Sequence, residues 1–97
     1  MAEIYQIGSG MIGQAMALDL AENHKIHLAD LNVENVRKEI KDHPAIITYD
    51  LDVLNKKKLS SFIKKADIVL LAVPGYLGYS TLETIISSGK NVVDISF

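Results

Sequence analysis

The sequence has 97 residues, a length that allows one domain with one modest core. The net charge is −2, and the sequence therefore lacks the positive charge that nonspecific nucleic-acid binding needs. The absence of cysteine excludes disulfide scaffolds, thiol nucleophiles and zinc–thiolate sites. No apolar run approaches the roughly 18 residues of a membrane span, and the first residues lack the order of a signal peptide. We therefore expect a cytoplasmic globular protein that binds neither nucleic acid nor membrane.

The chain alternates strand-like apolar runs with segments of helical periodicity. Proline and glycine separate many of these segments, and asparagine or serine precedes three of the helical ones. The predicted strands cover 4–7, 25–29, 45–49, 67–73 and 91–95. The predicted helices cover 11–23, then run from Asn32 to about 42, from Asn55 onward, and from Ser80, which forms a capping box with Glu83, to Gly89.

Two of these segments indicate how the elements pack. In the first helix Gly13, Ala17 and Ala21 share one face, which allows the helix to approach a strand closely. The run 67–73 is apolar without alternation, as expected for a strand covered on both faces of a parallel sheet. Five strands separated by four helices predict an α/β fold. We expect a Rossmann-type, doubly wound parallel sheet in the order 3-2-1-4-5, with helices on both faces.

The segment 8–13, GSGMIG, matches the pattern G-x-G-x-x-G. It follows an apolar strand and opens a helix, and Asp30 ends the next strand, which together form the context of a dinucleotide-binding loop. Gly8 permits a tight turn, Gly10 lets the backbone approach a pyrophosphate, and Gly13 allows contact between helix and strand. Unpaired N–H groups at the helix start would then face the phosphates. The alternative is a purely structural turn.

Asp30 is the residue from which we predict the cofactor. A carboxylate at this position can accept both hydroxyls of an adenosine ribose, as in NAD, whereas it would repel a 2′-phosphate at ~4 Å by roughly 1 to 4 kcal/mol. Leu31 and Asn32 stand where an NADP-binding arginine is usual. Arg37, the only arginine in the sequence, could reach back only if the loop bent. We therefore predict NAD, with NADP less favoured. Asp30 could also cap the following helix.

Other polar residues permit more than one interpretation. Asp50 and Asp52 follow the third strand, where one could bind an adenine amino group with Val53 against the ring, or could simply cap the loop. His24 and His27 should point to opposite sides, roughly 10 Å apart. Neither these two nor His43 has a cysteine or carboxylate cluster beside it. We therefore expect no metal site.

The motifs together resemble the saccharopine dehydrogenase family, and most of all its lysine 6-dehydrogenase-like branch. The resemblance lies in GSGMIG (8–13), ADLN (29–32), AVPGYLG (72–78) and VVDISF (92–97). It implies an NAD-dependent oxidoreductase acting at a C–N bond of an amino acid. It also implies that 72–74 line the cofactor near the nicotinamide. The cofactor-binding residues expected from the motifs and the resemblance are Gly8, Ser9, Gly10, Met11, Ile12, Gly13, Asp30, Leu31, Asp52, Val53, Ala72, Val73 and Pro74.

The sequence stops directly after the fifth predicted strand. We therefore expect 1–97 to be a truncated NAD(P)-binding Rossmann domain whose sixth strand and substrate domain are absent. Because the catalytic residues of the resembled enzymes lie largely in that second domain, no catalytic residue is expected here. We also expect a homo-oligomer. A stand-alone NAD-sensing module, of the kind associated with transporters, and a methyltransferase are the alternative functions.

Overall fold

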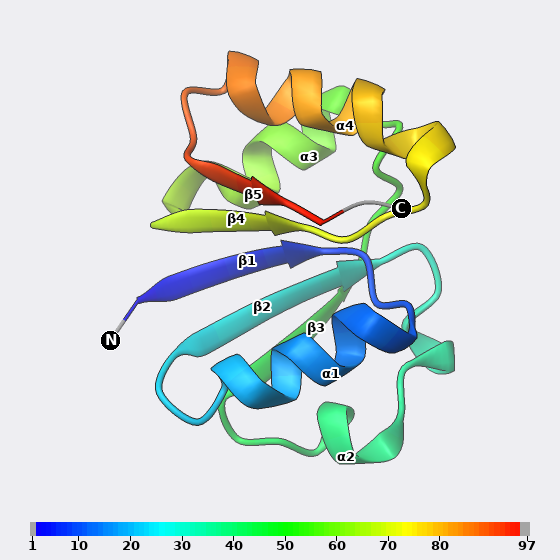
Figure 1. Ribbon diagram of the computed structural model, residues 1–97, viewed down its shortest axis with the longest axis vertical. Helices are drawn as coiled ribbons and strands as arrows, with labels where there is room; N and C mark the ends of the chain where they lie inside the picture. Colours follow the sequence, from blue (N-terminus) through cyan, green and yellow to red (C-terminus); the bar gives the residue numbers. More distant parts are fainter. Residues whose placement is uncertain (1, 96–97) are drawn as a thin grey trace.

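The computed structural model describes residues 2–95 and contains a five-stranded parallel sheet in the order β3-β2-β1-β4-β5 (Figure 1). The predicted Rossmann-type fold and its strand order are therefore confirmed. The strands are β1 Glu3–Ile7, β2 Lys25–Asp30, β3 Ile46–Asp50, β4 Ile68–Leu71 and β5 Val92–Asp94. The helices are α1 Met11–Leu20, α2 Lys38–Lys41, α3 Lys56–Phe62 and α4 Gly75–Ser87, with 3-10 turns η1 Val33–Asn35 and η2 Ile63–Lys65.

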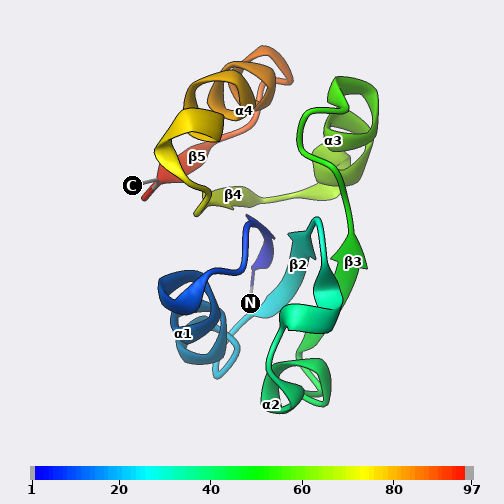
Figure 2. The ribbon, with the colours of Figure 1, turned by 90° about the vertical axis from the view of Figure 1, so that its right-hand side faces the viewer.

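Helices cover both faces of the sheet. Figure 2 shows α1 and α2 on one side and α3 and α4 on the other. An apolar cluster lies between the sheet and each layer of helices. One cluster is built around Ile26 and Ile40 and the other around Leu59 and Leu71, and all four side chains are fully buried. Because all the paired strands are parallel, their carboxyl ends meet at one edge of the sheet, where the loops after β1, β2, β3 and β4 come together. No helix within residues 2–95 is long and apolar enough to span a bilayer.

The small-residue face of α1 lies against the sheet as predicted. Gly13 and Ala17 are fully or almost fully buried, and so is Ala21 just after the helix. The helix ends at Leu20, three residues earlier than predicted, because the chain tightens into short-range hydrogen bonds there. The amide of Glu22 donates to the carbonyl of Asp19, an i to i−3 bond typical of a closing 3-10 turn.

The prediction of a single helix after Asn32 is wrong. Asn32 does cap a helical turn, accepting from the amide of Glu34 at 3.1 Å, but that turn is only η1. Val36 and Arg37 are extended, with ψ of 135° and 147°, and helical structure resumes in α2. The reason is a long-range contact: the Arg37 amide donates to the side chain of Gln14 in α1 instead of closing a helical bond. The chain therefore bends between η1 and α2.

The predicted start of the last helix is also wrong. α4 begins at Gly75, directly after Pro74, so Ser80 is an interior residue and forms no capping box. The carbonyl of Ser80 instead accepts from the Thr84 hydroxyl at 3.2 Å. Two glycines in 75–78 favour a loop when the sequence is taken alone, but burial of Gly78 against the domain holds the segment in the helix. The predicted stop at Gly89, which has φ +75°, is confirmed.

Candidate functional site

A cavity of about 860 Å³ lies at the carboxyl edge of the sheet. It is lined by every predicted cofactor-binding residue except Gly13, and so the fold brings together four segments that lie far apart in the sequence. Four further lining residues are Leu51, Leu54, Tyr76 and Leu77, which were not among the predicted cofactor-binding residues. Their position in the sequence could have identified them, since two flank Asp52-Val53 and two closely follow Pro74.

The glycine loop touches the end of β4 so closely that side chains are excluded. Gly8 has φ +99°, and a Cβ at this position would lie 2.1 Å from the carbonyl oxygen of Ala72. A Cβ on Gly13 would lie 3.1 Å from both the side-chain Nε2 of Gln6 and the carbonyl oxygen of Gly8. Both glycines are therefore needed to pack β1, the loop and α1 against β4. The tight turn at Gly8 and the close contact at Gly13 are as predicted, whereas the contact of Gly8 with Ala72 was not predicted.

The side chain of Gln6 holds the glycine loop in place by two hydrogen bonds. Its side chain is fully buried, and its Nε2 donates to the carbonyl of Gly8 at 3.1 Å and to that of Gly13 at 2.7 Å. Its Oε1 has no hydrogen-bond partner within residues 2–95. A buried amide with one unsatisfied atom is costly, so its two bonds to the loop are the structural reason for a polar residue in this strand. Gln6 was not among the predicted site residues, although a glutamine in an otherwise apolar strand was the available signal.

The start of α1 opens onto the cavity. Gly10 is the N-cap residue, with φ −62° and ψ 178°, and no side chain caps this end of the helix. Gly10, Met11 and Ile12 are all exposed and line the cavity. The first amides of a helix lack intrahelical acceptors and carry the positive end of its dipole. This end of α1 is therefore suited to an anion such as a pyrophosphate.

Asp30 also faces the cavity, but its carboxylate is engaged by the chain itself. One carboxylate oxygen accepts from the Ser9 amide at 2.9 Å and from the Ser9 hydroxyl. The other accepts from the Asn32 amide at 3.0 Å. Asp30 thus joins the end of β2 to the glycine loop and closes a turn to Asn32, but the N-cap of the following helical turn is Asn32, so Asp30 does not have the alternative role of N-cap.

Asp50, the last residue of β3, and Asp52 also accept backbone amides of the chain. Asp50 accepts from the Val33 amide at 3.3 Å, and Asp52 accepts from the Leu54 amide at 3.0 Å. Asp52 and Val53 line the cavity together with Leu54. The capping interpretation is therefore observed for both acids, while contact with an adenine stays a prediction for Asp52 and Val53.

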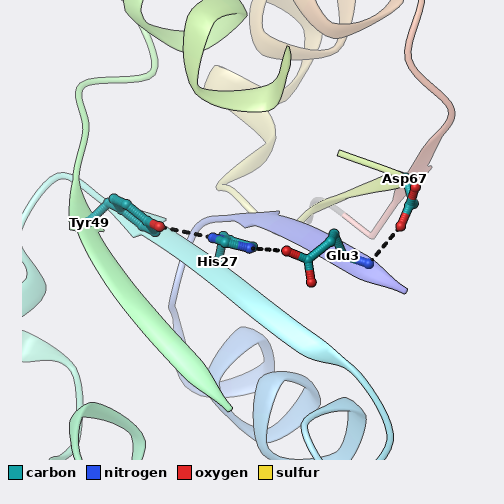
Figure 3. Close-up of polar contacts among 4 residues, drawn as sticks. All are labelled: Glu3, His27, Tyr49 and Asp67. Atoms are coloured by element: carbon teal, nitrogen blue, oxygen red, sulfur yellow. Dashed lines mark hydrogen bonds and ion pairs between the residues drawn. The ribbon is translucent and has the colours of Figure 1, made fainter. Parts of the chain in front are cut away.

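The three histidines have different surroundings. The Nδ1 atoms of His24 and His43 each accept a backbone amide at 3.0 Å, from Ala2 and Ala45. His27 is buried and lies between the Tyr49 hydroxyl at 2.9 Å and a Glu3 carboxylate oxygen at 3.1 Å, a line across three strands shown in Figure 3. Within the described part of the chain, no group of three or more His, Cys, Asp or Glu side chains could hold a metal ion.

Comparison with known families shows to which family the chain belongs. The family model described as the saccharopine dehydrogenase NADP binding domain matches residues 4–97. The chain belongs to this family. The last of the motifs that suggested it, VVDISF, extends into residues 96–97, which lie outside the described part. Membership of the saccharopine dehydrogenase NADP binding domain family thus rests on a match to almost the whole chain.

Solved structures show the same fold. Saccharopine dehydrogenase from Saccharomyces cerevisiae matches with a TM-score of 0.84 and 21% identity over 100% of this chain and 22% of its own. A wide-type short-chain dehydrogenase/reductase from Veillonella parvula, in complex with NADP, matches with a TM-score of 0.78 and 20% identity over 96% and 46%. A Rossmann-fold NAD(P)-binding family protein from Shigella flexneri gives 0.79 and 19% over 95% and 50%. No curated protein matches the sequence. The chain therefore spans about a fifth of the yeast enzyme and at most half of the other two.

The prediction of NAD is wrong. The matched family is an NADP binding domain, and the Veillonella structure is a complex with NADP. The prediction assumed that the Asp30 carboxylate is available to two ribose hydroxyls and repels a 2′-phosphate. In the structure its two oxygens already accept three hydrogen bonds from Ser9 and Asn32, which disperse part of its charge. The chain also bends at Arg37, whose backbone amide donates to the side chain of Gln14.

Proposed function

We propose that this chain is the cofactor-binding domain of an NADP-dependent oxidoreductase related to saccharopine dehydrogenase. The observation that carries the proposal is the uncapped start of α1, which opens beside Gly8 and Gly10 onto a cavity of about 860 Å³ in a chain of this family. The close packing of Gly8 supports the fit, because it holds the loop against the end of β4 and leaves room for a dinucleotide on the other side of the loop. NADP supplies the hydride chemistry when bound, and the chain binds and orients it.

The lining residues divide into three groups along the proposed dinucleotide. The amides at Met11 and Ile12 would hold the pyrophosphate. Asp52 and Val53 would lie at the adenine, next to the apolar side chain of Leu54. Residues 72–74, at the end of β4, would lie toward the nicotinamide and set which ring face meets the substrate. These assignments follow the order of the strands in the sheet, where β1 lies between β3 and β4.

The substrate we propose is an amino acid, or an adduct of one, oxidised or reduced at a C–N bond, as in the lysine 6-dehydrogenase-like branch. The resemblance of the motif AVPGYLG to that branch supports the proposal, and Tyr76 and Leu77 of this motif line the cavity beside 72–74. We further propose that a second domain supplies the catalytic residues. The family match does not favour the alternative of a stand-alone sensing module. The test is turnover of lysine or saccharopine with NADPH or NADP by the full-length protein.

Cofactor binding is tested with the variant Gly10→Asp. Gly10 has an ordinary negative φ, so aspartate fits there, and it is a favourable N-cap residue. It would nevertheless place a carboxylate against the pyrophosphate. We expect isothermal titration to show NADPH binding by the parent chain, at micromolar affinity or weaker, and a loss of about tenfold or more in the variant.

Gly10→Asn is the matched control, because asparagine caps equally well without the charge. We expect it to keep more affinity than the aspartate variant, and both variants to melt no lower than the parent. Absence of NADPH binding by the parent chain, or equal affinity in the two variants, would contradict the proposed pyrophosphate position.

A further inference from the structure

Gln14 connects the glycine loop to the only arginine in the sequence. Gln14 lies in the second turn of α1, where its Nε2 donates to the carbonyl of Ser9 at 2.7 Å. Its Oε1 accepts from the backbone amide of Arg37 at 3.0 Å. One side chain thus spans from the loop to the bend between η1 and α2. The backbone of Arg37 is held close to the glycine loop although it lies 23 residues from Gln14 in the sequence.

The same loop residue contacts Asp30. Ser9 donates its amide and its hydroxyl to that carboxylate, while its carbonyl accepts from Gln14. The Asp30 carboxylate is therefore bonded to Ser9 directly, and the backbone of Arg37 is linked to the same residue through the side chain of Gln14. In a dinucleotide-binding fold, the end of β2 is where the adenosine ribose lies, and NADP differs from NAD by a phosphate on the 2′-hydroxyl of that ribose.

The guanidinium of Arg37 is available for a stronger anion. Its Nη1 lies 3.1 Å from a carboxylate oxygen of Glu39, and the two side chains are 54% and 57% exposed. An exposed pair of this kind contributes little, so a phosphate dianion can displace it. The neighbouring lysines are directed elsewhere: Lys38 pairs with Asp42, and the Lys41 ammonium donates to the carbonyl of Glu34 at 3.2 Å.

From these contacts we infer that Arg37, positioned by Gln14, binds the 2′-phosphate of NADP. The inference rests on the proposed function, since it requires the dinucleotide to lie in the cavity. A guanidinium can form two parallel hydrogen bonds to a phosphate, and it would offset the charge of Asp30 across the ribose. The selectivity for the phosphate thus comes from a residue seven positions beyond the end of β2, brought back by the bend.

The experiment compares NADPH and NADH binding by isothermal titration in four proteins: the parent chain, Arg37→Gln, Lys38→Gln and Glu39→Gln. We expect Arg37→Gln to weaken NADPH binding by about ten- to a hundredfold, the value of a lost charged hydrogen bond, and to leave NADH binding unchanged. Lys38→Gln, which removes the same charge one residue away, should stay within about twofold of the parent. Glu39→Gln, which removes the competing carboxylate, should tighten NADPH binding by about two- to fivefold.

Three results would overturn the inference while leaving the proposed function standing. These are equal losses of NADPH affinity in Arg37→Gln and Lys38→Gln, an equal loss for NADPH and NADH in Arg37→Gln, or weaker NADPH binding in Glu39→Gln. Melting temperatures of the variants identify any loss that arises from unfolding, and adenosine 2′,5′-bisphosphate against AMP repeats the comparison on the adenosine end alone. Failure of the parent chain to bind NADPH would instead overturn the proposed function itself.

Discussion

At the scale of single residues, two glycines with positive φ have different surroundings. Gly8, at φ +99°, lies against the Ala72 carbonyl, whereas Gly89, at φ +75°, has no atom within 4 Å of the position where a Cβ would be. Both relieve backbone strain, but only Gly8 also relieves a steric clash. The two positions therefore separate the conformational role of glycine from its packing role.

We expect Gly8→Ala to lower the free energy of unfolding by more than about 3 kcal/mol, the sum of backbone strain and overpacking. Gly89→Ala should cost only about 1 kcal/mol, since it carries the strain alone. Urea unfolding followed by circular dichroism measures both. Equal losses in the two variants would show that the contact with Ala72 contributes nothing.

At the scale of elements, a line of polar and aromatic side chains crosses the first three strands on the face covered by α3. Tyr5 stacks on His27 with ring centroids 4.1 Å apart, and Phe62 of α3 packs edge-on against Tyr5 and Tyr49. The amide of Glu3 donates to Asp67 at 2.8 Å, which extends the line toward β4 (Figure 3). Burial is the main cause that raises the pKa of both Tyr5 and Tyr49 above the usual 10.0, with a further contribution from the negative charge of Glu3.

These shifts predict a loss of stability in alkali. Because the phenol pKa values are raised in the fold, the unfolded chain releases its protons first, near pH 10. The stabilisation is complete below pH 10 and decreases as the pH rises through the folded-state pKa. We expect the melting temperature of Tyr49→Phe to fall less between pH 9 and pH 11 than that of the parent chain.

Tyr79→Phe is the matched control, since its ring is 78% exposed. It should follow the parent across the same pH range. A Tyr49→Phe curve parallel to that of the parent would contradict the prediction, whatever its offset. An offset at neutral pH is expected, because the variant loses the hydrogen bond from the Tyr49 hydroxyl to His27.

At the scale of the whole molecule, the two edges of the sheet differ in their apolar exposure. At the β5 edge, Val93 is 45% exposed, and Ile86 and Tyr79 of α4 lie largely in solvent. At the β3 edge, Ile47 is 39% exposed. Unpaired edge strands with apolar neighbours favour association. Homo-oligomer formation stays a prediction, and β5 with α4 is the edge at which we expect it.

We therefore expect sedimentation velocity at high protein concentration to show self-association of the parent chain. Val93→Lys should reduce it, because a lysine on an edge strand opposes strand pairing. Ile47→Lys, the same change on the opposite edge, should leave it unaltered. A monomeric parent chain, or an equal effect of both lysines, would contradict association through β5.

The fold and the glycine loop were predictable because the signals that specify them are local. Apolar runs and the breaks between them set the order of strands and helices, and the spacing within GSGMIG predicted the turn at Gly8 and the close contact at Gly13. Likewise, the caps at Asn32 and Asn55 were found correctly, since each bonds an amide two or three residues away. The family resemblance followed from the same short motifs and is confirmed by the family match.

Only the tertiary structure decided which partners the site residues have. Ser9 binds Asp30 across 21 residues and Gln14 binds Arg37 across 23, and no local pattern encodes either contact. The prediction of NAD failed because it treated Asp30 as an isolated carboxylate. The helix after Asn32 was predicted too long for the same reason: a hydrogen bond from another element outcompeted the local helical bond. Local periodicity thus determines where elements form, and packing between elements determines where they end and what their polar groups bind.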